Sequence, residues 1–182
     1  MRRFLLAAVA CTAVAGCGSD SPETPAPASA SVPAQAVAAA RTDRDWPLFG
    51  VGNDRANVTA AGADATKLRR IELEVPGTVD SSPIYLHGVP VAGATHDVFV
   101  VTTTYGRTLA LDAAGGRVLW TYTPPGIETW EGSAQIANAT PAADPGRAFV
   151  YTASPDGLVH KLSLADGREA GGRWPVRLTR DA

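Results

Sequence analysis

The feature that most constrains the fold is an internal repeat with a spacing of 51 positions. Gly106 and Arg117 recur 51 positions later as Gly157 and Arg168. Short runs rich in β-branched and aromatic residues flank these glycines, and helical periodicity is weak throughout. The runs that we predict to be strands cover residues 98–103, 108–112 and 117–122 in the first copy, and 148–153 and 158–163 in the second. Glycines between the first three runs supply the positive φ of tight hairpins, so we predict an antiparallel meander of three strands.

The length of the repeat indicates an architecture. Repeats of about 40–45 residues built from four short strands are typical of β-propeller blades. We therefore predict an all-β fold for residues 45–182, a partial β-propeller of about two to three four-stranded blades. Complete propellers have about 4–8 blades, so we interpret the chain as the incomplete N-terminal part of a longer protein or as an incomplete gene product. The alternative is a small complete domain that assembles with copies of itself.

One stretch of the first copy carries a family signature. Residues 110–120 read Ala-Leu-Asp-Ala-Ala-Gly-Gly-Arg-Val-Leu-Trp, which resembles the Ala-x-Asp-x-x-Thr-Gly-x-x-x-Trp repeat of pyrroloquinoline quinone (PQQ)-like, quinoprotein alcohol dehydrogenase-like β-propellers. Gly115 stands where that repeat usually has Thr. The lead-in segment Asp45-Trp46-Pro47 is also similar to that of the family. The resemblance implies that Trp120 docks against the neighbouring blade. The resemblance implies the same role for Trp174, which lies three residues beyond the position that the repeat spacing gives in a less regular second copy.

The N-terminus has the pattern of a bacterial lipoprotein leader. Arg2 and Arg3 precede an uncharged apolar run over residues 4–15, which has the length of a signal-peptide core and is too short to span a bilayer. Val14-Ala15-Gly16-Cys17 resembles a lipobox, which implies cleavage after residue 16 and a lipid on Cys17. The alternatives are an ordinary secretory signal with an incidental cysteine, and a short membrane helix.

These patterns divide the chain into three parts. Residues 1–16 are predicted to be a lipoprotein signal peptide, 17–44 the anchor cysteine with a flexible Pro-, Ala- and Ser-rich linker, and 45–182 the incomplete propeller repeats. The expected location is the extracytoplasmic face of the cell membrane or outer membrane. Cys11 would leave with the leader, so no cysteine remains in the folded part for a disulfide or for catalysis.

The charge balance argues against one class of partner. The chain has 16 Lys and Arg against 18 Asp and Glu, a net charge of −2. A nucleic-acid-binding protein needs a clustered basic surface, so we expect no nucleic-acid partner. The expected partners are the membrane, through lipidated Cys17, and a protein of unknown identity.

Candidate catalytic residues are few, and we assign neither a catalytic residue nor a metal ligand. PQQ and Ca²⁺ are implied only if the chain belongs to a quinoprotein dehydrogenase, and Ca²⁺ needs several converging oxygen ligands. The polar cluster of suitable type comprises Glu128, Trp130, Glu131, Gln135 and Asn138. We interpret this cluster as a polar loop between blades in which Trp130 packs. We interpret His87, His96 and His160, which are isolated in the sequence, as surface or loop residues.

Three functional hypotheses follow. The preferred one is a non-catalytic, membrane-anchored propeller lipoprotein that acts as a binding or scaffold module and is part of a longer propeller. The second is the N-terminal part of a PQQ-dependent alcohol or sugar dehydrogenase, for which the lead-in segment is evidence. The third is a truncated product with no activity of its own. An enzymatic activity is therefore not excluded, but the non-catalytic hypothesis is preferred.

Overall fold

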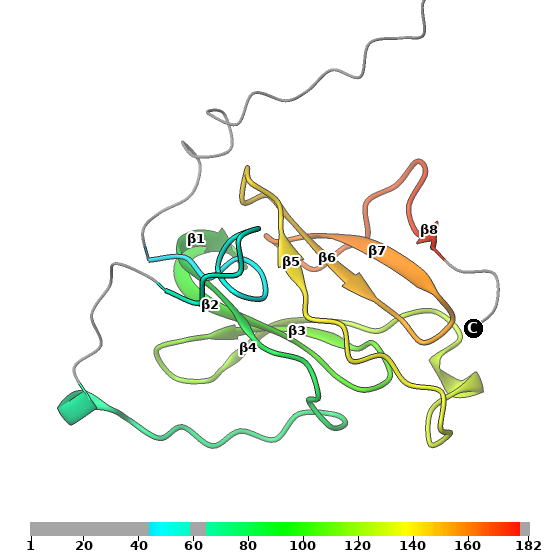
Figure 1. Cartoon of the computed structure of the whole chain (residues 1–182), viewed down its shortest axis with the longest axis horizontal. Coiled ribbons are helices and arrows are strands. Elements are labelled where there is room, and N and C mark those ends of the chain that lie inside the picture. Colours follow the sequence, from blue (N-terminus) through cyan, green and yellow to red (C-terminus); the bar gives the residue numbers. More distant parts are fainter. Residues whose placement is uncertain (1–43, 59–64, 179–182) are drawn as a thin grey trace, which may run out of the picture. The chain divides into compact units, whose positions relative to one another are not determined.

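The computed structural model describes residues 44–58 and 65–178, which form two four-stranded antiparallel sheets (Figure 1). The first sheet contains β1 (Ile84–Val91), β2 (Ala94–Thr102), β3 (Thr108–Asp112) and β4 (Val118–Tyr122). The second contains β5 (Ala142–Ala143), β6 (Phe149–Ala153), β7 (Leu158–Ser163) and β8 (Val176–Arg177). The helical elements of the described part are the short 3₁₀ turns η1 (Ala65–Lys67) and η2 (Ile127–Thr129). The predicted all-β fold is confirmed, and the two sheets fit a partial propeller.

Each sheet is a meander in which consecutive strands are neighbours, in the order β1-β2-β3-β4 and β5-β6-β7-β8. The glycines that mark the repeat lie at equivalent turns. Gly106 connects β2 to β3 with φ 86°, and Gly157 connects β6 to β7 with φ 79°. Both angles lie in the left-handed region that glycine adopts without steric cost. The repeat in the sequence therefore corresponds to a repeat of hairpins in the structure.

The first sheet has one strand more than the predicted three-stranded meander. β1 pairs with β2, but its register shifts between Leu86 and Val89, and Gly88 has φ 59°. A glycine, a proline at position 90 and this irregularity interrupt the alternation that identifies a strand in a sequence. The second sheet is less regular, because its first and last strands have two residues each.

The main hydrophobic core lies between the two sheets. Alternation along each strand places one set of side chains on the facing surfaces. The first sheet contributes Ile84, Leu86, Val98, Val100 and Ala110, and the second contributes Val150 and Leu162 with Leu164. Burying each large aliphatic side chain stabilises the fold by about 1.5–3 kcal/mol. The sheets are thus joined by an extensive apolar contact.

The predicted signal peptide, the anchor Cys17 and the linker lie outside the described residues, apart from the linker's last residue, position 44. Within the described ranges, no helix has the length and apolar character to cross a bilayer.

Candidate functional site

Trp120 lies on β4 of the first sheet and reaches the second sheet. Its side chain is 8% exposed, and its indole Nε1 donates a hydrogen bond to the carbonyl oxygen of Leu164 at 2.8 Å. The ring also lies over Gly167, where an added Cβ would come within 2.6 Å of the Trp120 Cε3 atom. The close approach therefore requires glycine at position 167. A role for Trp120 in holding the sheets together remains a prediction, for which this geometry gives a physical basis.

Trp174 has different surroundings. It is half-buried, and its ring lies 5.4 Å from that of Tyr151, with the Arg173 guanidinium 5.9 Å from its centroid. Tyr151 alternates along β6 with Val150, which faces the core, so Tyr151 and Trp174 lie on the surface of the second sheet that faces away from the first. No further sheet packs on this surface within the described residues.

A buried polar network surrounds His160 on β7. His160 is 1% exposed; its Nδ1 lies 2.6 Å from Oε1 of Glu169, and its Nε2 lies 2.8 Å from Oγ of Ser154. The hydroxyl of Tyr122, on β4 of the first sheet, lies 3.0 Å from His160 Nδ1 and donates to Oε2 of Glu169 at 3.3 Å. The interpretation of His160 as a surface or loop residue is therefore wrong. Its position two residues before Leu162, on the buried side of the strand, was the signal available in the sequence.

Burial, the negative charge of Glu169 and the hydrogen bond to that carboxylate all raise the pKa of Tyr122 well above its usual range. The phenol therefore stays protonated at physiological pH and remains a donor. It joins the last strand of the first sheet to the segment that follows β7 in the second.

The hydrogen-bonded series from Ser154 through His160 to Glu169 resembles a hydrolase triad, in which a base activates a serine nucleophile. A nucleophile must be reached by its substrate, but Ser154 is 4% exposed. Its hydroxyl also donates to Asp156 Oδ1 at 2.5 Å. The arrangement is therefore suited to holding the turn and the two sheets in place, not to acyl transfer.

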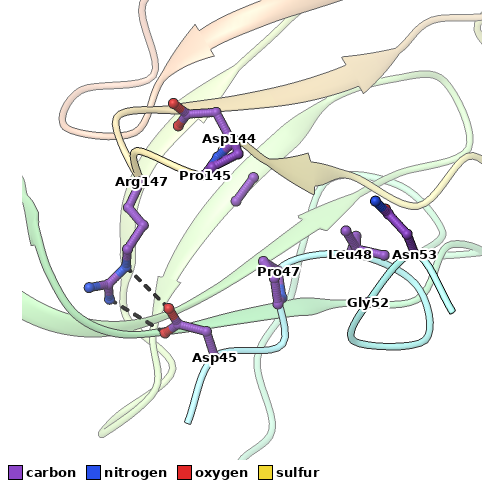
Figure 2. Close-up of a pocket in the computed structure, with 9 residues that line it drawn as sticks. Asp45, Pro47, Leu48, Gly52, Asn53, Asp144, Pro145 and Arg147 are labelled. Atoms are coloured by element: carbon purple, nitrogen blue, oxygen red, sulfur yellow. Dashed lines mark hydrogen bonds and ion pairs between the residues drawn. The ribbon is translucent and has the colours of Figure 1, made fainter. Parts of the chain in front are cut away.

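A recess of about 270 Å³ lies between the lead-in segment and the β5–β6 hairpin (Figure 2). Its lining includes the apolar side chains of Pro47, Leu48, Ala143 and Pro145, together with Asn53. At one side, Asp45 and Arg147 form an ion pair, with Arg147 Nε 3.2 Å from Asp45 Oδ2. The carboxylate and the guanidinium neutralise one another, so the recess offers mainly apolar walls to a small group.

The lead-in segment is bonded to both sheets. Trp46 exchanges backbone hydrogen bonds with Tyr85 of β1, at 2.7 and 2.9 Å, and the Pro47 carbonyl accepts one from the Ala143 amide of β5 at 2.8 Å. Asp45 Oδ1 also accepts from the His87 amide at 2.8 Å. No local pattern in the sequence indicates the ion pair of Asp45 with Arg147, because 102 positions separate the two residues. The lead-in segment therefore connects the two sheets through hydrogen bonds to both.

The remaining histidines lie on strands of the first sheet. His87 on β1 pairs with Asp97, at 2.8 Å from Nδ1 to Oδ1, and His96 on β2 lies 3.6 Å from Oδ2 of Asp112. Neither side chain is fully exposed. Each histidine therefore has a carboxylate beside it, which its isolation in the sequence did not indicate.

The polar loop between the sheets does not bring its candidate ligands together. Arg107 donates to Glu131 at 2.6 Å, and this hydrogen bond lowers the pKa of Glu131. Gln135 donates to the carbonyl of Pro155, while Trp130 is 6% exposed and donates to the carbonyl of Tyr105. Glu128, on η2, and Asn138 are both exposed. These contacts tie the loop to the two hairpin turns.

The donor set of the described residues does not match a PQQ and Ca²⁺ site. Residues 44–58 and 65–178 contain no group of three or more His, Cys, Asp or Glu side chains that could hold a metal ion. Ca²⁺ requires several converging oxygens, whereas Glu131 and Gln135 of the 126–138 loop contact separate partners, Arg107 and the Pro155 carbonyl.

Comparison with solved structures agrees with this architecture of two stacked four-stranded sheets, a partial β-propeller. A quinohemoprotein alcohol dehydrogenase from Comamonas testosteroni has a TM-score of 0.51 and 22% identity, covering 76% of this chain and 22% of its own. Another, ADHIIG from Pseudomonas putida HK5, has a TM-score of 0.59 and 22% identity, covering 81% of this chain and 21% of its own. The chain thus spans about a fifth of the length of these proteins, whose fold it shares over that part. No protein-family model and no curated protein matches the sequence.

Proposed function

We propose that the chain is a lipoprotein, anchored through Cys17 to the extracytoplasmic face of the cell membrane or outer membrane, whose stacked sheets serve as a rigid binding or scaffold module of a longer PQQ-like propeller. The observation that carries the scaffold role is that the polar side chains at the contact between the sheets bond to protein groups. Trp120, Tyr122 and His160 each bond across or beside the contact between sheets, rather than lining the recess. Such a framework presents loops in fixed positions.

The anchor is supported by the lipobox-like Val14-Ala15-Gly16-Cys17 and by the tether that follows it. Two acyl chains give stable membrane attachment, whereas one is marginal. We expect the full chain, expressed in a bacterium, to fractionate with membranes and to incorporate labelled palmitate. Cys17→Ser should abolish the label and release the protein from membranes.

Cys11→Ser is the matched control for this experiment, because Cys11 lies in the part that signal cleavage would remove. It should leave both labelling and fractionation unchanged. Membrane retention of Cys17→Ser without label would contradict the lipid anchor and favour a membrane helix.

A second candidate function is supported by the likeness to two quinohemoprotein alcohol dehydrogenases. In this alternative, the chain is the N-terminal part of a PQQ-dependent alcohol or sugar dehydrogenase. We expect purified full chain with PQQ, Ca²⁺ and an artificial electron-accepting dye to show no substrate-dependent dye reduction with several alcohols and sugars. Turnover above that of a heat-denatured control would contradict the scaffold role for this chain and establish the dehydrogenase alternative.

A further inference from the structure

The His160 network holds more short polar contacts than a neutral imidazole can bridge. Ser154 Oγ lies 2.5 Å from Asp156 Oδ1 and 2.8 Å from His160 Nε2. On the other side of the ring, Nδ1 lies 2.6 Å from Glu169 Oε1. Separations of this size between polar atoms are those of hydrogen bonds, so each of the three contacts requires a proton.

A count of the available protons gives two to the ring. The Glu169 side chain is 22% exposed and Asp156 is half-buried, so water reaches both carboxylates, and carboxylates in contact with water are ionised at neutral pH and act only as acceptors. The single hydroxyl proton of Ser154 is donated to Asp156. Ser154 Oγ therefore accepts from Nε2, and Glu169 Oε1 accepts from Nδ1. A histidine that donates from both ring nitrogens is the imidazolium.

Tyr122, on β4 of the first sheet, supplies no proton to the ring. Its own proton goes to Glu169 Oε2 at 3.3 Å, and its oxygen, 3.0 Å from His160 Nδ1, is a second acceptor for the proton there. Burial and the negative charge of Glu169 raise the pKa of Tyr122, which keeps the phenol a donor. The imidazolium of the second sheet therefore bonds directly to a residue of the first.

The charged groups around the ring favour its protonated form. Glu169 faces it from the segment after β7, and Asp156 reaches it through Ser154 from the β6–β7 turn. Thr152, the partner of His160 across the strand pair on β6, is uncharged. The basic side chains close to the network in the chain contact other groups: Lys161 the Phe149 ring, Arg168 the Asp166 carboxylate, and Arg177 the Asp156 carbonyl. An opposite charge within about 4–6 Å stabilises the charged form of a titratable group, and Glu169 meets this condition.

We propose that His160 is an imidazolium in the folded chain and that its second proton fastens the two sheets together, which makes the contact between them weaken as the pH rises. Loss of that proton leaves one of the three contacts with two lone pairs at hydrogen-bond distance, and a buried polar group without its partner is costly. The network lies between the two described sheets, and this inference does not depend on the proposed function.

The direction of the pH dependence follows from the proton count. An unconstrained histidine has a pKa of about 6.5 and is almost entirely neutral at about pH 7.5. The folded chain then binds one proton more than the unfolded chain, so the free energy of unfolding falls as the pH rises above about 6.5. A buried neutral His160 would give the opposite result, a loss of stability as the pH falls below about 6.5.

Nitrogen NMR of the full chain, isotopically labelled at histidine and kept in reducing agent at about pH 7.5, tests the protonation state. The two ring nitrogens of an imidazolium have similar chemical shifts, whereas those of a neutral ring are widely separated. The variant His87→Gln/His96→Gln leaves His160 as the only histidine of the chain, which assigns its signals. We expect similar shifts for both nitrogens of His160. Widely separated shifts would overturn the proposal.

Glu169→Gln removes the charge beside Nδ1 and keeps the size of the side chain, so the two His160 shifts should be widely separated in this variant at the same pH. Glu131→Gln is the matched control, because Glu131 pairs with Arg107 in the 126–138 loop, and it should leave the shifts unchanged. An imidazolium retained in Glu169→Gln would overturn the proposal, as would an equal effect of the two variants.

Urea unfolding of the same chains tests the consequence for stability. The equilibrium constant of unfolding of the wild-type chain, divided by that of Glu169→Gln, should rise by up to tenfold per pH unit between about pH 6.5 and 8, because one proton is released on unfolding. A ratio that stays constant or falls over this range would mean that the contact between the sheets does not depend on the second proton, and would overturn the proposal.

Discussion

At the scale of single residues, Trp120 contacts the second sheet through both its polar and its apolar atoms. Its Nε1 supplies a hydrogen-bond donor to the Leu164 carbonyl, and the face of its indole lies against Gly167. Trp174 has neither contact and packs on Tyr151 within its own sheet. The two tryptophans that the repeat pattern pairs therefore differ in what their removal would cost.

Replacing Trp120 should destabilise the protein more than replacing Trp174. Trp120→Phe leaves the Leu164 carbonyl buried without its donor, which should cost about 1–3 kcal/mol in the free energy of unfolding. Trp120→Ala also leaves a cavity and should cost about 3–5 kcal/mol. Trp174→Phe should cost below about 1 kcal/mol, because it keeps a ring on a half-exposed surface. Urea unfolding followed by far-ultraviolet circular dichroism measures all three, and equal losses at the two positions would contradict a docking role for Trp120.

At the scale of elements, the sequence predicted the strands that turn glycines separate, and it missed the strand with a register shift and the strands of two residues. The runs at 108–112 and 158–163 coincide with β3 and β7. β1 was missed because Gly88 and the register shift interrupt its alternation. Contacts between elements were harder to predict, because the partners of His160 and Asp45 come from distant turns and strands. Such pairs depend on how the sheets stack, and the local periodicity of the sequence carries no information about that stacking.

The turn after β7 provides an element-scale test. Gly167 has φ 73°, and an added Cβ would lie 2.6 Å from Trp120. Gly167→Ala therefore adds a steric clash to backbone strain. Gly172→Ala is the matched control, because its φ is 79° and nothing lies within 4 Å of its added Cβ. Gly172→Ala should cost about 1 kcal/mol from strain alone, and Gly167→Ala at least about 2 kcal/mol more. Equal costs in urea unfolding would show that Trp120 can move away from the turn.

At the scale of the whole described structure, contacts of several kinds join the two sheets, among them the Trp120 hydrogen bond to Leu164. The apolar core lies between them, the Tyr122 hydroxyl bonds to His160 and Glu169, and the lead-in segment is bonded to both β1 and β5. The second sheet has outer strands of only two residues and few contacts of its own to hold them. Its stability should therefore depend on the first sheet.

This dependence predicts that the two sheets open as one cooperative unit. In hydrogen exchange of the full chain followed by mass spectrometry, the slowest amides of β2 and of β6 should exchange with the same free energy, because neither sheet retains its core when the other opens. Tyr122→Phe removes the phenol hydrogen bonds between sheets and should lower both values together by about 1 kcal/mol. Tyr105→Phe is the control, since its hydroxyl donates to the Ser133 carbonyl in an exposed loop, and it should change neither value by more than about 0.5 kcal/mol. Two results would contradict this: a lower free energy of exchange for β6 than for β2 in the wild-type chain, or a decrease confined to one sheet in Tyr122→Phe. Either would mean that the sheets unfold independently and that the contact between them does not stabilise the second sheet.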